Sequence, residues 1–166
     1  MQVHVVLADV VELPLDAIVV PTDSSGQMNE GLALAAKARA GEEVEREVVQ
    51  CAPIAVGAAV VTPGGGLFAK HVIHVPIVEE PGLKITIEAV RRATRAALLA
   101  AAAHCLNVVA LPFMGRRPSE LTNGETARAM VDELRAHRHP YPATIYLADP
   151  VREIAWLYEE ALRAGQ

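Results

Sequence analysis

Four polar or glycine-rich segments carry the residues of this sequence whose types and spacing could do chemistry. Each follows a short apolar run of strand-like composition, and the segments span residues 8–13, 21–31, 62–70 and 112–123. In open α/β sheets, ligands bind beyond the carboxyl ends of the strands, where loops lead into helices. These four loops are therefore the candidate positions of a ligand site.

The first two loops combine carboxylates with exposed backbone amides. Asp9 comes directly after an apolar run, and it either caps a turn or accepts a hydrogen bond from a ligand. The second loop reads Pro21-Thr-Asp-Ser-Ser-Gly-Gln-Met-Asn-Glu-Gly31 and opens a helix. Unpaired amides at a helix start attract anions. The alternative for this second loop is a flexible linker without a ligand.

The other two loops offer glycines and guanidinium groups. Residues 62–67 read Thr-Pro-Gly-Gly-Gly-Leu, but no Lys-Ser/Thr follows them, which favours a hairpin-like turn over a phosphate-binding P-loop. The segment Pro112-Phe-Met-Gly-Arg-Arg-Pro-Ser119 places two arginines beside a predicted helix start. Arginine forks suit phosphate oxygens. A solvated surface pair is the alternative interpretation.

The elements that must position these loops alternate between strands and helices. Strands are predicted at Val3–Ala8, Ala17–Pro21, Ala58–Thr62, His71–Ile77, Val108–Pro112 and Thr144–Ala148. Several of them are almost uniformly apolar, which is typical of strands covered on both faces. The pattern predicts a single α/β domain over residues 1–166, a three-layer α/β/α sandwich around a six-stranded mixed sheet.

Helices are predicted between these strands. Two of them, Glu30–Ala40 and Glu42–Cys51, are separated at Gly41, and a long alanine-rich helix spans Leu83–His104. In that long helix Glu88 is spaced to meet Arg91 and Arg92 one turn later.

Two further helices have recognisable starts. Thr122-Asn-Gly-Glu125 matches a capping box. Asp149-Pro150 has the form of an N-cap followed by proline at the first helical position, which predicts that the last helix begins there.

Composition limits the classes of partner. With 15 Lys and Arg against 20 Asp and Glu, the formal net charge is −5, which argues against a protein that coats extended nucleic acid. The longest apolar stretch, residues 96–103, is too short to span a bilayer. We therefore expect a cytoplasmic protein without a membrane partner. The two cysteines form no CxxC pair, and neither a metal nor a cofactor is predicted.

The order of these segments resembles the macrodomain family. Ala8-Asp9-Val10, then Asp16-Ala-Ile-Val-Val-Pro21 with Asp23-Ser-Ser after it, follow the pattern of that family's first two strands. Residues 57–74 are similar to its middle segment, and Val109-Ala-Leu-Pro112 to the strand before its second phosphate loop. The resemblance spans nearly the whole chain. It implies a pocket for ADP-ribose or a related adenine nucleotide, either free or attached to a protein.

The resemblance also implies roles for individual residues. Asp9 would accept a hydrogen bond from the adenine amino group, and Val10 would offer its backbone amide nearby. The loop toward the distal ribose and diphosphate and the second phosphate loop would contribute Ser24, Ser25, Gly31, Leu32, Gly115, Arg116 and Arg117. His74 falls on the family's strand histidine, and we interpret it as a packing residue.

Departures from the family pattern leave three functions open. Asp23 stands where the family has its loop asparagine, and Arg116-Arg117-Pro118 stand where glycines are usual. Binding of ADP-ribose is the first interpretation. The second is an ADP-ribosyl hydrolase or an ADP-ribose-1''-phosphate phosphatase in which Asp23 orients or deprotonates water. The third is a degenerate macrodomain that acts as a homo-oligomerisation or protein-interaction module, with its cleft filled by Met28, Arg116 or Arg117.

Overall fold

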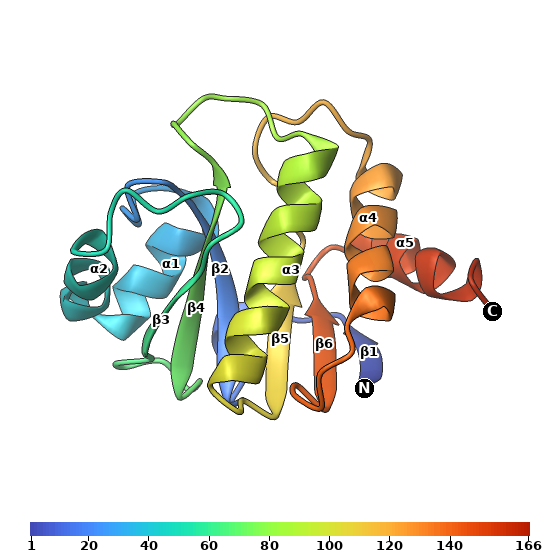
Figure 1. Cartoon of the computed structure of the whole chain (residues 1–166), viewed down its shortest axis with the longest axis horizontal. Coiled ribbons are helices and arrows are strands. Elements are labelled where there is room, and N and C mark those ends of the chain that lie inside the picture. Colours follow the sequence, from blue (N-terminus) through green and yellow to red (C-terminus); the bar gives the residue numbers. More distant parts are fainter.

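The computed structural model describes residues 1–166 and contains six strands, five α-helices and one short 3-10 helix (Figure 1). In chain order the elements are β1 (Gln2–Val6), η1 (Val10–Glu12), β2 (Ala17–Asp23), α1 (Gly31–Ala40), α2 (Glu42–Val49), β3 (Val60–Pro63), β4 (His71–Val78), α3 (Ile87–Ala103), β5 (Val108–Pro112), α4 (Asn123–Ala136), β6 (Thr144–Ala148) and α5 (Arg152–Arg163). None of these helices is long and apolar enough to cross a membrane.

All six strands form one mixed sheet in the order β1-β6-β5-β2-β4-β3. Every neighbouring pair is parallel except β3 and β4, which are antiparallel. The loops that follow β1, β2, β5 and β6 therefore leave the sheet at one edge, because the carboxyl ends of parallel strands coincide. This geometry confirms the predicted sandwich and brings three of the four candidate loops together.

Two apolar clusters cover the two faces of the sheet. The larger one packs α3, α4 and α5 against side chains such as Val19, Ile73 and Leu111. The smaller one packs η1, α1 and α2 against Ile18 and Val20. Figure 1 shows α3 and α4 lying in front of the sheet. The inner strands β2, β4 and β5 are buried on both faces, which explains their nearly continuous apolar sequences, whereas the edge strands β1 and β3 are partly exposed.

The predicted start of the long helix was wrong. The helix α3 begins after Thr86, whose hydroxyl accepts a hydrogen bond from the Ala89 amide at 3.1 Å. The preceding Ile85 is extended, and its backbone pairs with the segment after β5: its amide donates to the Pro118 carbonyl at 2.8 Å, and its carbonyl accepts from Glu120 at 2.9 Å. Pairing with a distant loop overrides the helical preference of residues 83–86 and fixes the loop that carries both arginines.

The helix starts and surface pairs were predicted in part. The capping box at Thr122 and Glu125 is present, and Glu88 pairs with Arg92 at 3.1 Å. Arg91 does not meet Glu88 and pairs with Asp132 of α4 at 3.1 Å.

Residues 62–70 form the predicted turn between two antiparallel strands. Its glycines serve close packing. At Gly65 the backbone φ is +58°, and a Cβ atom would lie 2.2 Å from the Ala40 carbonyl oxygen at the end of α1. These glycines allow the turn to pass beneath the junction of α1 and α2, so they are used for structure.

His74 is buried in the middle of β4, as its interpretation as a packing residue requires. Its Nε2 lies 2.9 Å from the Thr62 hydroxyl, and its Nδ1 has no hydrogen-bond partner in the protein. Burial lowers the pKa of His74 to about 4. The native state therefore holds the neutral imidazole, because a charged ring would lack solvation there.

This burial predicts an acid-sensitive component of stability. The unfolded chain binds the proton with a pKa near 6.5 and the folded chain only near 4. Protonation of the unfolded chain therefore lowers the free energy of unfolding as the pH falls from ~6.5 toward ~4, by about 3 kcal/mol at most. Above pH ~6.5 this loss is absent. Urea titrations of the wild type and His74→Gln from neutral to mildly acidic pH measure the difference.

The exposed histidine His104 supplies the matched control. We expect His74→Gln to lower the free energy of unfolding near neutral pH and to reduce its decline in acid, whereas His104→Gln follows the wild type. Parallel pH profiles for the wild type and His74→Gln would contradict the assignment.

Candidate functional site

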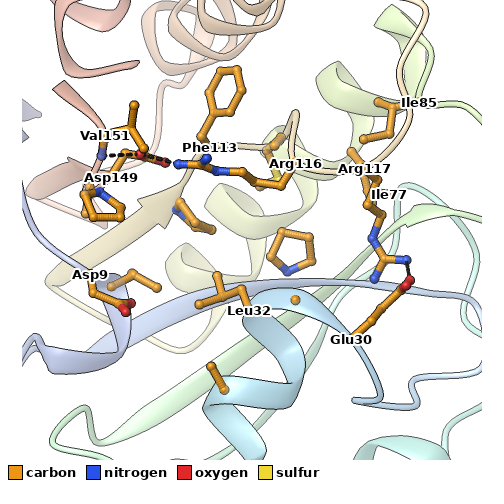
Figure 2. A pocket seen from close by; sticks show the side chains of 18 of the residues that line it. Asp9, Glu30, Leu32, Ile77, Ile85, Phe113, Arg116, Arg117, Asp149 and Val151 are labelled. Atoms are coloured by element: carbon orange, nitrogen blue, oxygen red, sulfur yellow. Dashed lines mark hydrogen bonds and ion pairs between the residues drawn. The ribbon is translucent and has the colours of Figure 1, made fainter. Parts of the chain in front are cut away.

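A cavity of about 720 Å³ lies at the sheet edge where β1, β2, β5 and β6 end. Its volume is within the range of roughly 300–1,000 Å³ that is typical of small-molecule sites. The lining is largely apolar and carries five ionisable side chains. These are Asp9, Glu30, Arg116, Arg117 and Asp149. Figure 2 shows that they come from the loops after β1, β5 and β6 and from the start of α1.

The charged side chains divide into two groups at opposite ends of the cavity (Figure 2). At one end, Asp9 and Asp149 follow the neighbouring strands β1 and β6, and the Arg116 guanidinium reaches Asp149. At the other end, Arg117 pairs with Glu30, the N-cap residue of α1. Three carboxylates thus face two guanidinium groups, and both arginines are already ion-paired.

Asp149 is the most strongly held of these groups. Its side chain is 4% exposed, and its Oδ1 accepts hydrogen bonds from Arg116 Nη2 and, at 2.8 Å, from the Val151 amide. The prediction that Asp149-Pro150 starts the last helix was therefore wrong, because α5 begins after Val151. The carboxylate is retained by an arginine that lies 33 positions earlier in the chain.

The buried Tyr158 hydroxyl stays protonated. Burial raises the pKa of Tyr158 well above its usual value, and the Asp149 carboxylate raises it further. The Tyr158 hydroxyl donates to Met130 Sδ at 3.4 Å, and its ring meets the edge of Phe113 at a centroid distance of 6.0 Å. Phe113 lines the cavity, and Tyr158 and Met130 pack behind it in the larger apolar cluster.

The ion pair at the other end is more open. The Glu30 side chain is 58% exposed, whereas that of Arg117 is 16% exposed. Glu30 makes no side-chain hydrogen bond to the first turn of α1. Because the first amides of a helix lack intrahelical partners, the amides beside Gly31 and Leu32 are available at the cavity wall.

Asp9 follows β1 and lies at the cavity wall. Its Oδ1 accepts from the Val11 amide at 3.2 Å, which caps the short helix η1. The residue is exposed and lines the cavity together with Val10. It therefore both caps a turn and presents a carboxylate to the cavity.

Four of the predicted site residues do not line this cavity: Asp23, Ser24, Ser25 and Gly115. Asp23 is buried, with 6% of the residue exposed, and its Oδ1 accepts from the Ser25 hydroxyl and, at 2.8 Å, from the Ser25 amide. The Ser24 amide donates a hydrogen bond to the Glu79 carbonyl, and the Ser24 carbonyl accepts one from the Ile54 amide. The carboxylate of Asp23 thus closes a turn between β2 and α1.

Gly115 is also absent from the lining, and its role is local packing. A Cβ atom there would lie 2.5 Å from the ring of Phe113. The cavity lining therefore includes Gly31, Leu32, Arg116 and Arg117 from the two predicted phosphate loops, but not Gly115.

Met28 does not fill the cavity. Its side chain is fully buried in the cluster beneath α1, and its amide donates to Glu45 Oε2 at 2.7 Å. Desolvation opposes the ionisation of Glu45, but the hydrogen bonds from Met28 and Lys37 hold its pKa below the usual value. This anchor ties the segment before α1 to α2 and leaves the cavity open.

Sequence reasoning missed Asp149 as a cavity residue, along with apolar residues such as Ile77 and Ile85. A usable signal was present for Asp149. Like Asp9, it follows an apolar strand, and the two strands are neighbours in the sheet. Asp149 was instead interpreted as a helix N-cap because Pro150 follows it.

Comparisons with known proteins identify the family to which this chain belongs. The family model named Macro domain matches residues 19–130. An uncharacterized protein of Aquifex aeolicus is 41% identical over 162 residues, which cover 98% of each chain. An uncharacterized protein of Aeropyrum pernix is 36% identical over 85% of this chain and 75% of its own.

Solved structures share the fold at low identity. A mutant macrodomain of Oceanobacillus iheyensis with ADPR has a TM-score of 0.85 at 17% identity, over 98% of this chain and 92% of that one. A Trypanosoma brucei macrodomain in complex with ADP-ribose has a TM-score of 0.81 at 22% identity, over 97% and 69%. The six-stranded mixed sheet was expected from the sequence, and the family match covers most of the chain. The chain belongs to the macro domain family.

Proposed function

We propose that this protein binds ADP-ribose, or a closely related adenine nucleotide, in the cavity at the carboxyl ends of the strands. The observation that carries the proposal is the division of the cavity into two ends. At one end the Asp9 carboxylate can accept a hydrogen bond from a nucleobase, and at the other the first amides of α1 and Arg117 can bind phosphates. Two solved structures of similar fold support it: an Oceanobacillus iheyensis macrodomain with ADPR and a Trypanosoma brucei macrodomain in complex with ADP-ribose. The ligand would be free or attached to a protein.

The charge balance of the cavity shapes this binding. A diphosphate is doubly negative, and the cavity carries one more carboxylate than guanidinium groups. The ligand must therefore replace a carboxylate as the partner of an arginine. Glu30 is the carboxylate that water can solvate after it leaves, whereas Asp149 is nearly inaccessible to water.

The cavity is open, which favours binding over the interaction-module interpretation. That third interpretation expects Met28, Arg116 or Arg117 to fill the cleft. Met28 is buried elsewhere, and both arginines are held at the walls by carboxylates. Homo-oligomer formation stays a prediction that sedimentation can test.

Removal of the Asp9 charge tests the binding proposal. Asp9→Asn keeps an oxygen for the Val11 amide but loses the negative charge. We expect affinity for ADP-ribose to fall about five- to tenfold, because a charged acceptor contributes roughly 1 kcal/mol more than a neutral one. Isothermal titration measures the change, and Asp132→Asn on α4, away from the cavity, serves as the matched control. No heat from the wild type at millimolar ADP-ribose would contradict the proposal.

Neutralising Glu30 should strengthen binding. In Glu30→Gln the competing carboxylate is lost, and Arg117 becomes free for phosphate. We expect affinity for ADP-ribose to rise roughly two- to fivefold, as exposed ion pairs are worth about 1 kcal/mol or less. Glu43→Gln removes a comparable exposed carboxylate on α2, which pairs with Arg46, and should leave affinity unchanged. Weaker binding by Glu30→Gln would show that Glu30 helps to hold the ligand.

The hydrolytic alternatives depend on Asp23, and no feature of the structure favours them. Its carboxylate is occupied by Ser25 and does not line the cavity. We expect ADP-ribosylated protein and ADP-ribose-1''-phosphate to be turned over at background rates by the wild type and by Asp23→Asn alike. Substrate turnover by the wild type that Asp23→Asn abolishes would establish an enzyme.

A further inference from the structure

Arg116 is fixed in a way that distinguishes it from a phosphate ligand. Its guanidinium donates to Asp149, a carboxylate that is 4% exposed and that also accepts the Val151 amide at 2.8 Å. If Arg116 turned to a phosphate, it would leave this buried carboxylate without its cationic partner, which is strongly unfavourable. The guanidinium is therefore held in place when a ligand enters.

The cavity offers no aromatic face to a planar ligand. Phe113 is the only aromatic side chain on its lining, and it is 3% exposed. Its ring stands at 78° to that of Tyr158 and is covered by the core. A base that enters the cavity must find another flat partner or remain unstacked.

The Arg116 guanidinium supplies such a surface. It is planar, 52% of its side chain is exposed, and it lies at the end of the cavity that also holds Asp9 (Figure 2). Guanidinium planes stack on aromatic rings and nucleobases, and an ion pair in the plane of the group leaves its faces free. Asp9 would then accept a hydrogen bond from an amino group at the edge of the same base.

We propose that Arg116 is the stacking platform for the base of the bound nucleotide, and that Asp149 is the positioning residue that sets the plane of its guanidinium. This inference rests on the proposed function and assigns the two arginines different tasks. Arg116 contacts the base through its flat face. Arg117, whose partner Glu30 is exposed, contacts phosphate through its charge.

Substitution of Arg116 by lysine separates these tasks, since lysine keeps the charge but lacks the plane. We expect Arg116→Lys and Arg116→Ala to lower affinity for ADP-ribose by a similar factor, about tenfold. Arg128→Lys, an exposed residue on α4 outside the cavity, is the matched control and should bind as the wild type does. Circular dichroism verifies that each variant is folded.

A second readout reports the stacking directly. In NMR spectra of wild-type protein with labelled arginine, saturation with ADP-ribose should shift the Arg116 side-chain protons upfield through the ring current of the base. In Asp149→Asn the shift should shrink and the affinity should fall, with little added loss in the Asp149→Asn/Arg116→Ala double variant.

The outcomes separate the inference from the proposed function. If the wild type does not bind ADP-ribose at all, the proposed function fails and the inference fails with it. If the wild type binds but Arg116→Lys retains its affinity, or saturation produces no upfield shift at Arg116, the stacking role is wrong while the proposed function stands.

Discussion

Parallel pairing of β1, β6, β5 and β2 is the constraint on which the candidate site depends. These four strands run in one direction, and the backbone groups that face a neighbouring strand are paired within the sheet. The polar side chains therefore lie in the loops at the strand ends. The carboxyl ends of these strands lie together at one edge of the sheet. Residues 9, 116 and 149, which are distant in the chain, therefore lie around one cavity.

Within that edge, Asp149 sets the local geometry. A carboxylate with 4% exposure cannot rely on water, so it must be matched by donors from the protein. It takes one from the Val151 backbone and one from Arg116. These bonds delay the start of α5 and fix the loop after β5. The same loop is held from its other side by Ile85, whose backbone pairs with residues 118 and 120.

The fold could be predicted further than the site because it depends on regular patterns. Continuous apolar runs located β5 and β6 at their observed bounds, and the Thr122 capping box located α4. The roles of single residues with several possible partners were harder to predict. Asp149-Pro150 has the local form of a helix start, and only the folded chain brings Arg116 to it. Asp23 was a candidate catalytic residue in the second interpretation because it stands where the family has its loop asparagine, but its nearest donors are on Ser25, two residues away.

The contrast between Arg116 and Arg117 follows from the exposure of their partners. Adjacent in sequence, they look equivalent as two cations in a loop. An anion competes with the existing partner, and the cost of that exchange is set by how well the displaced carboxylate is solvated afterwards. Glu30 is 58% exposed and returns to water, whereas Asp149 would remain buried. Exchange is therefore confined to the Arg117 end of the cavity, next to the uncapped start of α1. A ligand with an anionic part and a flat, uncharged part matches this asymmetry in one orientation only.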